Sequence, residues 1–130
     1  MRLYLVRHAK SDPGSPDELR PLNAKGREQA RELAEGLAGA EPTLVLTSPL
    51  VRAYETAAAI ATATGAELRV DERLRPGATA TGLLEAVASE DGPVVAVGHQ
   101  PDCSEIAVEL TGADPGFKPA GMLELELPTR

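Results

Sequence analysis

The chain contains little cysteine, few aromatic residues and no excess of positive charge. Its single cysteine, Cys103, excludes an internal disulfide and a cysteine-based zinc cluster. Two Tyr, one Phe and no Trp mean that the core must be built from aliphatic side chains. Thirteen Lys and Arg against twenty Asp and Glu give a net charge of -7, which argues against nucleic acid or an anionic membrane as a partner. Any anion-binding site must therefore depend on a local cluster of positive side chains rather than on the net charge of the chain.

Long hydrophobic runs are also missing. The longest apolar run near the N-terminus, residues 3–6, is followed by Arg7 and is too short for a signal-peptide core or a membrane span. Together with the single cysteine, this predicts a cytoplasmic protein. A length of 130 residues, with 42% hydrophobic and 25% charged residues, is typical of one globular domain, which we expect to span residues 1–130.

Short apolar segments predict the strands of a sheet. Uninterrupted runs at residues 3–6, 44–46 and 94–97 are typical of strands that are buried on both faces of a parallel sheet. Residues 67–70 form a further short strand. Residues 122–127 instead alternate Leu with Glu, which indicates a strand with one wet face at an edge of the sheet.

Helical patterns lie between these strands. Apolar residues at helical spacing predict four helices, which cover residues 23–37, 48–65, 83–91 and 102–111. Asn23 and Ser48 are expected to be N-caps, and Asp102 begins an Asp-x-x-Glu sequence that resembles a capping box. The alternation of strands and helices predicts an α/β fold, a three-layer α/β/α domain with a mostly parallel sheet and the C-terminal strand at an edge.

Only two histidines are present, and each directly follows a predicted buried strand. His8 follows the first strand, and His99 follows the strand at residues 94–97. Ligands of open parallel sheets bind at the carboxyl ends of the strands, so we expect both imidazoles at the same edge. Arg7 adjoins the first histidine, and Arg52 in the opening turn of the second helix leans toward that edge.

Two histidines and two arginines beside helix N-termini form a pocket for a dianion. Phosphate is the natural occupant, although sulfate would fit equally well. Neutral imidazole is a nucleophile toward phosphorus, and the neighbouring arginines should lower the pKa of one histidine. Arg and His donors can stabilise the negative charge of the phosphoryl transition state without a metal. These residues therefore predict metal-independent phosphoryl chemistry.

Four motifs occur in the order in which the histidine phosphatase superfamily carries them. They are Leu5-Val6-Arg7-His8-Ala9-Lys10, Arg20-Pro21-Leu22-Asn23 with Lys25-Gly26, Ser48-Pro49 with Arg52-Ala53 and Thr56-Ala57, and Val97-Gly98-His99-Gln100-Pro101. Because the match spans nearly the entire chain, the sequence closely resembles this superfamily and, within it, the small phosphohistidine phosphatases of the SixA type. Ala9 stands where many relatives carry Gly, so a small residue is kept.

The resemblance implies a role for each core residue. His8 would be the nucleophile that is transiently phosphorylated, and Arg7, Arg52 and His99 would bind the phosphoryl group before water hydrolyses the phosphoenzyme. No metal and no other cofactor are implied. Arg20 is a further candidate for a phosphate or substrate contact, and the alternative is a loop cation that braces Asp17.

The proton donor for the leaving group is less well defined. Larger members of the superfamily place an acidic residue in or near an inserted segment, whereas residues 70–81 form a short stretch here. Glu72 and Asp102 are the candidates, but Glu72 also fits a solvated carboxylate and Asp102 a helix cap. Phosphohistidine loses an imidazole that is readily protonated, so a strong acid matters less than it does for an alkyl ester. This favours a phosphoamino acid substrate in a site open enough for a protein surface.

Other chemistries have weaker support in the sequence. A thiol phosphatase needs Arg six residues after its Cys, and that position is Glu109. A nucleotide phosphate loop of the form G-x-x-x-x-G-K-[ST] does not occur, and the histidines lack a clustered carboxylate set for a metal. The leading hypothesis is a phosphatase that acts on protein phosphohistidine. A small-molecule phosphomonoesterase and a non-catalytic phosphate-binding signalling module are the alternatives, so the partner is a phosphorylated protein or small molecule.

Overall fold

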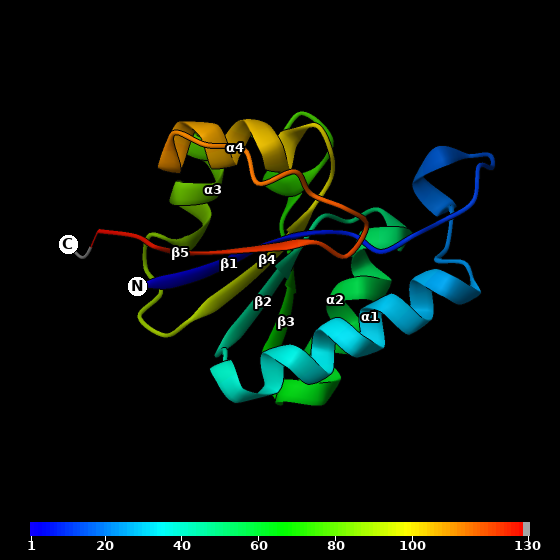
Figure 1. Cartoon of the computed structure of the whole chain (residues 1–130), viewed down its shortest axis with the longest axis horizontal. Coiled ribbons are helices and arrows are strands. Elements are labelled where there is room, and N and C mark those ends of the chain that lie inside the picture. Colours follow the sequence, from blue (N-terminus) through cyan, green and yellow to red (C-terminus); the bar gives the residue numbers. More distant parts are fainter. Residues whose placement is uncertain (129–130) are drawn as a thin grey trace.

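A computed structural model describes residues 1–128 and shows a five-stranded sheet with helices on both faces (Figure 1). The strands and α-helices, in chain order, are β1 (Arg2–Arg7), α1 (Ala24–Leu37), β2 (Leu44–Thr47), α2 (Val51–Thr64), β3 (Glu67–Val70), α3 (Ala80–Val87), β4 (Val94–Gly98), α4 (Asp102–Thr111) and β5 (Met122–Glu126). Three short 3-10 helices are η1 (Asp17–Leu19), η2 (Ala38–Ala40) and η3 (Glu72–Leu74).

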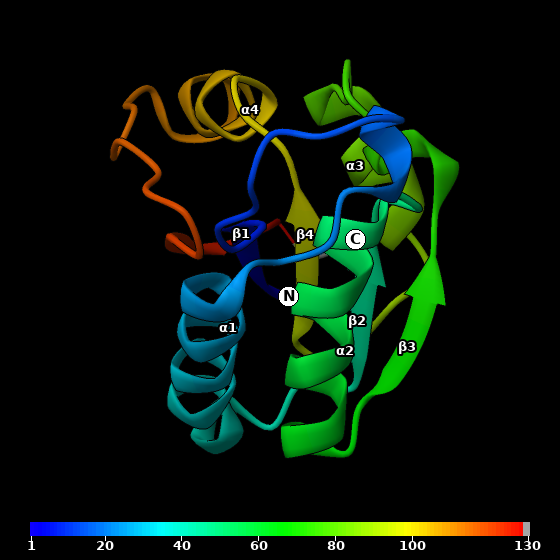
Figure 2. The same ribbon diagram turned by 90° about the vertical axis from the view of Figure 1, so that its right-hand side faces the viewer.

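The strand order is β3-β2-β4-β1-β5. Strands β3, β2, β4 and β1 are parallel, whereas β5 pairs antiparallel with β1 at the edge of the sheet. Helices α1 and α2 cover one face and α3 and α4 the other, which Figure 2 shows in a view turned by 90°. The three-layer α/β fold with a mostly parallel sheet and the C-terminal strand at an edge is therefore confirmed.

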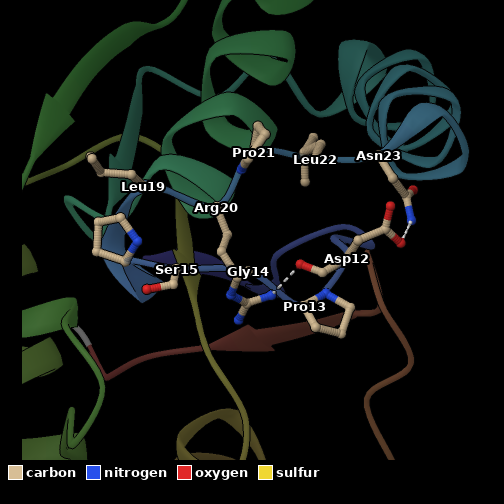
Figure 3. A pocket seen from close by; sticks show the side chains of 10 residues that line it. Asp12, Pro13, Gly14, Ser15, Leu19, Arg20, Pro21, Leu22 and Asn23 are labelled. Atoms are coloured by element: carbon tan, nitrogen blue, oxygen red, sulfur yellow. Dashed lines mark hydrogen bonds between the residues drawn. The ribbon is translucent and has the colours of Figure 1, made fainter.

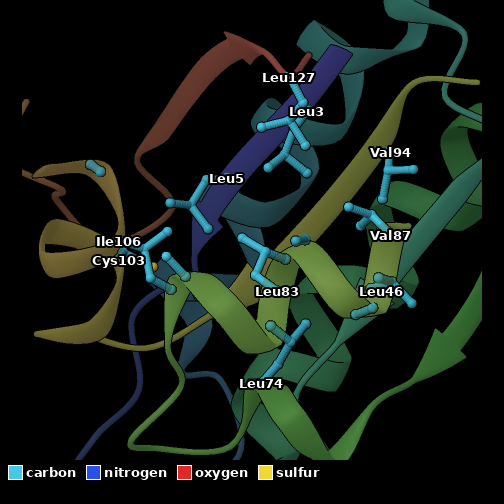
Figure 4. Close-up of a cluster of buried hydrophobic side chains, with 14 of the residues drawn as sticks. Leu3, Leu5, Leu46, Leu74, Leu83, Val87, Val94, Cys103, Ile106 and Leu127 are labelled. Carbon is cyan, nitrogen blue, oxygen red and sulfur yellow. The ribbon is translucent and has the colours of Figure 1, made fainter. Parts of the chain in front are cut away.

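Alternate residues of the buried strands supply two separate cores. Leu3 and Leu5 of β1 face α3 and α4, where they pack with residues such as Leu83 and Ile106 (Figure 4). Tyr4 and Val6, also of β1, face α1 and α2 on the other side. Both faces of β1 are thus apolar, which explains why its sequence shows an uninterrupted apolar run rather than alternation. Burial of this aliphatic surface is the main stabilising contribution of the sheet.

The helix starts agree with the sequence at α1 and α4 but differ at α2, and of the predicted capping residues only Asn23 is confirmed. The Asn23 side chain caps α1 by accepting a hydrogen bond from the Gly26 N–H at 2.8 Å. Ser48 is not the cap of α2, because the helix begins at Val51 and Leu50 is its N-cap. Asp102 is not a cap either. It lies within the first turn of α4, after Pro101 as N-cap, and its carboxylate accepts bonds from another segment.

The four α-helices differ in length, with 8 residues in α3 and 10 in α4. Helices α1 and α2 contain 14 residues each. Helix α3 spans Ala80–Val87, so it begins and ends earlier than the predicted range of residues 83–91. Across residues 1–128, no helix combines the length and the apolar character needed to cross a membrane.

A glycine lets α1 approach the segment that follows β1. A Cβ at Gly26 would collide with the carbonyl oxygen of Lys10, so only glycine fits at this point of the helix. The same carbonyl accepts a hydrogen bond from the Asn23 N–H at 3.0 Å, and the Lys10 N–H donates to Gln29. The start of α1 therefore holds the chain just beyond β1 in place.

Candidate active site

A cavity of about 530 Å³ opens at the carboxyl ends of the parallel strands. Its lining residues are Arg7, His8, Ala9, Lys10, Ser11, Asp17, Arg20, Arg52, Pro76, His99, Gln100 and Pro119. Backbone hydrogen bonds that continue beyond the strands bring the segments together. The His8 N–H donates to Gly98 O at 3.0 Å, and the Ser48 N–H donates to Val97 O at 3.1 Å. The residues that follow β1, β2 and β4 thus meet at one edge of the sheet.

His8 is oriented by its own backbone. Its Nδ1 lies 2.7 Å from Ala9 O, and because a carbonyl oxygen only accepts, Nδ1 carries the proton and Nε2 keeps its lone pair. Burial, and the positive charges of Arg52 and Arg7, lower the pKa of His8 to about 4. The hydrogen bond to Ala9 acts in the opposite direction but is outweighed. At neutral pH the ring is uncharged, with a free Nε2.

His99 packs against His8 across the cavity floor. The two ring centroids are 5.2 Å apart with an angle of 60° between the planes. His99 is 3% exposed, and its Nε2 is 2.8 Å from Ser48 Oγ. Burial lowers the pKa of His99 to about 3, assisted by His8 and Arg52. Ser48 Oγ also accepts the Leu50 N–H at 3.2 Å, so the serine connects the imidazole to the start of α2.

Arg7 and Arg52 are anchored through their terminal nitrogens. Arg7 Nη1 donates to Phe117 O at 3.0 Å. Arg52, which is 5% exposed, donates from Nη1 to Asp17 O at 2.8 Å and from Nη2 to Asp17 Oδ2 at 3.2 Å. The structure therefore brings His8, His99 and both arginines to one cavity, as the sequence predicts.

Three buried nitrogens at this cavity have no hydrogen-bond partner. They are Arg7 Nε, Arg52 Nε and His99 Nδ1, and they are the only buried side-chain nitrogen or oxygen atoms without a partner within residues 1–128. Buried polar atoms are nearly always hydrogen-bonded in proteins, so their clustering at one site is informative. All three belong to residues that line the cavity. An anion with several acceptor oxygens is the type of ligand that such side chains bind.

Arg20 fits both of the roles that the sequence left open. It lines the cavity, and its Nε also donates to Asp17 Oδ1 at 2.9 Å. Its Nη1 donates to Ser11 Oγ and to Asp12 O, each at 2.9 Å. The guanidinium group therefore braces the loop while it remains at the edge of the cavity.

Asp17 is the site residue that sequence reasoning treated only as a partner of Arg20. It is the single carboxylate among the lining residues, and it contacts both Arg20 and Arg52. The hydrogen bond from Arg20, together with the Arg52 contacts, holds the pKa of Asp17 below its usual value, so the group stays ionised. Its place three residues before Arg20 in a Pro-rich loop was the available signal.

Neither candidate proton donor lines the cavity. Glu72 is exposed and forms an ion pair with Arg75. Asp102 is buried, and its Oδ2 accepts the backbone N–H groups of Gly77 at 2.8 Å and Ala78 at 3.2 Å. Because Pro76 lines the cavity, Asp102 fixes the segment that forms one wall. Within residues 1–128, no group of three or more His, Cys, Asp or Glu side chains is arranged to hold a metal ion.

Comparison with known proteins supports an enzyme of one superfamily. The family model of the histidine phosphatase superfamily, branch 1, matches residues 3–90. An uncharacterized protein of Picosynechococcus sp. is 37% identical in an alignment that covers 96% of this chain and 84% of that protein. A glucosyl-3-phosphoglycerate phosphatase of Mycobacterium tuberculosis is 33% identical over 79% of this chain, which spans only about half of that protein (49%).

The similarity extends to solved structures. A protein from Agrobacterium tumefaciens, assigned as the phosphohistidine phosphatase SixA, matches with a TM-score of 0.84 and 28% sequence identity. The match covers 96% of this chain and 90% of that one. The whole fold is therefore shared, including the sheet edge at which the cavity lies.

Proposed function

Because the chain belongs to branch 1 of the histidine phosphatase superfamily, we propose that it is a metal-independent phosphatase in which His8 is the nucleophile and protein phosphohistidine is the substrate. One observation carries this proposal. Two uncharged imidazoles lie 5.2 Å apart in a cavity that is lined by Arg7, Arg20 and Arg52. A neutral nucleophile beside several cations is suited to attack on a phosphoryl dianion.

The first step transfers the phosphoryl group to the enzyme. The Nε2 lone pair of His8 forms a bond to phosphorus while the bond between phosphorus and the leaving imidazole breaks. The leaving nitrogen keeps the electron pair of that bond and takes up a proton from solvent water, and the negative charge of the transition state is spread over three equatorial oxygens. Arg7, Arg52 and His99 stabilise this charge with donors that are already in place.

The second step regenerates the enzyme. Water attacks phosphorus and the bond to His8 Nε2 breaks. The oxygen of the water becomes part of inorganic phosphate, and its two protons leave with the phosphate or pass to solvent. The electron pair of the broken bond returns to His8 Nε2 as its lone pair, while Nδ1 remains hydrogen-bonded to Ala9 O. The backbone carbonyl thus keeps the ring in one tautomer and one orientation for both steps.

Phosphohistidine is the proposed substrate because the cavity, within residues 1–128, lacks a good proton donor for the leaving group. Its single lining carboxylate, Asp17, is held ionised by Arg20 and Arg52, so it is a poor acid. An alkoxide leaving group needs strong protonation, whereas an imidazole is protonated readily near neutral pH. The similarity over 96% of the chain to a protein assigned as a phosphohistidine phosphatase supports the same choice.

A comparison of substrates tests the function. We expect kcat/KM to be highest for a phosphohistidine protein, lower for free phosphohistidine, lower again for an aryl phosphate, and lowest for an alkyl ester such as phosphoserine. Release of inorganic phosphate is measured for each under the same conditions. Faster hydrolysis of alkyl esters would instead identify a small-molecule phosphomonoesterase. Tight phosphate binding without turnover of any substrate would identify a binding module.

The protonation state of the histidines gives a second prediction. With only two histidines in the chain, their ring protons can be followed by NMR as the pH is lowered. We expect no titration between pH 8 and pH 5, a midpoint for His8 at about 4 and one for His99 at about 3. A His8 midpoint at about 6.5, the value of a solvated imidazole, would contradict the proposed neutral, buried nucleophile.

Folding must be monitored in the same titration. In the unfolded chain both histidines take up protons below about pH 6.5, whereas in the folded protein they do so only near their lower pKa values. The unfolded state therefore binds more protons in this range, and the free energy of unfolding decreases as the pH falls. Circular dichroism at each pH distinguishes titration of the native site from acid unfolding.

A further inference from the structure

A second, smaller pocket lies beside the catalytic cavity. It has a volume of about 210 Å³, is open to solvent on one side and is lined by the loop between β1 and α1. We call it the loop pocket, and its lining residues are Asp12, Pro13, Gly14, Ser15, Pro16, Leu19, Arg20, Pro21, Leu22 and Asn23. Figure 3 shows these side chains arranged around the opening, with the Arg20 guanidinium between them. Arg20 lines both spaces, so the loop pocket adjoins the cationic cavity.

The wall of the loop pocket is largely apolar. Three prolines and two leucines contribute to it, in contrast to the charged cavity next to it. Leu19 is 63% exposed, the largest value among the exposed large hydrophobic side chains of residues 1–128. Isolated exposed leucines are common, but this one borders a pocket that shares Arg20 with the candidate active site. A cavity of only about 150 Å³ can hold benzene, so the loop pocket is large enough for one apolar side chain.

The loop is fixed by hydrogen bonds across its interior. Arg20 Nη1 binds Ser11 Oγ and Asp12 O, and Asn23 Nδ2 donates to Asp12 Oδ1 at 2.9 Å. On the outer side, the Leu22 N–H donates to Glu55 Oε1 at 2.7 Å. A loop that is held in this way does not need to be ordered when a ligand binds, which lowers the entropic cost of association.

We propose that the loop pocket binds an apolar side chain of the phosphorylated protein, from a residue next to the one that carries the phosphoryl group. This inference rests on the proposed function. The cavity is cationic and fits the phosphoryl dianion, whereas the loop pocket, which shares Arg20 with it, is largely apolar. Within residues 1–128, Arg20 is the single cation among the lining residues of the loop pocket, and its charge is already paired with Asp17. Consecutive Cα atoms are 3.8 Å apart, so one polypeptide can place a phosphoryl group and a neighbouring side chain in the two spaces.

Binding of stable peptide analogues tests this proposal. Each peptide carries a non-hydrolysable phosphohistidine mimic, flanked on either side by Leu or by Ser, and its affinity is measured by calorimetry. We expect the wild type to bind the Leu peptides about fivefold or more tightly than the Ser peptides. In Leu19→Ser this preference should disappear, while the affinity for inorganic phosphate stays unchanged. Val108→Ser, which also removes an exposed apolar side chain but lines neither space, should retain the preference.

The possible outcomes separate docking from catalysis. Equal affinity of the wild type for Leu and Ser peptides would overturn the proposal. So would a Leu19→Ser variant that loses affinity equally for both peptides and for inorganic phosphate, because the loop would then act on the anion cavity alone. A Leu preference that depends on Leu19, in an enzyme that hydrolyses no phosphohistidine, would support docking and reject the proposed function.

Discussion

Replacement of His8 by Ala is expected to abolish turnover and phosphoenzyme formation. The variant lacks the only uncharged ring nitrogen that has both a lone pair and a backbone-fixed orientation, since Nδ1 is hydrogen-bonded to Ala9 O at 2.7 Å. Loss of a nucleophile that forms a covalent intermediate costs about 10⁴-fold or more in kcat. The measurement is incubation with a phosphorylated substrate, rapid quenching, and detection of acid-labile, base-stable phosphate on the protein. The wild type should be labelled and His8→Ala should not.

Cys103→Ala is the matched control for this experiment. Cys103 is the other potential nucleophile, but it is 1% exposed and its burial raises the pKa of the thiol to about 12. The thiolate is therefore scarce at neutral pH, and the variant should be labelled like the wild type. Labelling that survives in His8→Ala and disappears in Cys103→Ala would reject the assignment of the nucleophile.

The sheet, and the convergence of Arg7, His8, Arg52 and His99 on one cavity, could be predicted because their signals are local. An uninterrupted apolar run such as Leu3–Val6 arises when both faces of a strand are buried, and the two cores on either side of β1 supply that condition. A residue that directly follows such a strand must lie at the carboxyl edge of the sheet. The positions of His8 and His99 directly beyond two such strands therefore predict that the two imidazoles lie near one another.

The two capping predictions that are wrong concern side chains whose partners are distant in sequence. Ser48 and Asp102 each have the residue type of a helix cap, yet each is in contact with another segment. Ser48 Oγ lies against His99 Nε2, 51 positions away, and the Asp102 carboxylate binds the N–H groups of Gly77 and Ala78. A cap signal depends only on the adjacent helix, so it cannot indicate that a buried tertiary partner is available.

Asp17 illustrates a different reason why a site residue is overlooked. The carboxylate belongs to the first residue of the short 3-10 helix η1, which the sequence analysis did not predict. Sequence spacing relates it to Arg20 but not to Arg52, which is 35 positions away. Its contact with Arg52 exists because the loop folds over the start of α2. In a chain with twenty acidic residues, composition alone gives no reason to select this one.

Substitution of Arg52 by Ala is expected to lower kcat by about 10²- to 10³-fold, the effect of losing one preorganised donor to a developing negative charge. Arg52 is 5% exposed, so its charge acts where water screens it poorly. Arg52→Lys keeps the charge but loses the planar fork, and it should retain only part of the activity. Initial rates with an aryl phosphate measure kcat, and inhibition by vanadate measures how well each variant binds a transition-state analogue.

The direct effect of Arg52 must be separated from its effect on the position of Asp17. Arg52→Ala also removes two hydrogen bonds to Asp17, so part of its effect could come from a displaced loop. Asp17→Asn weakens that contact while leaving Arg52 in place, and we expect it to reduce kcat by about tenfold or less. If Asp17→Asn lowered kcat and vanadate binding as much as Arg52→Ala, the arginine would act by holding the loop. A much larger loss in Arg52→Ala, with thermal stability close to that of Asp17→Asn, would instead mean that the guanidinium group contacts the phosphoryl group directly.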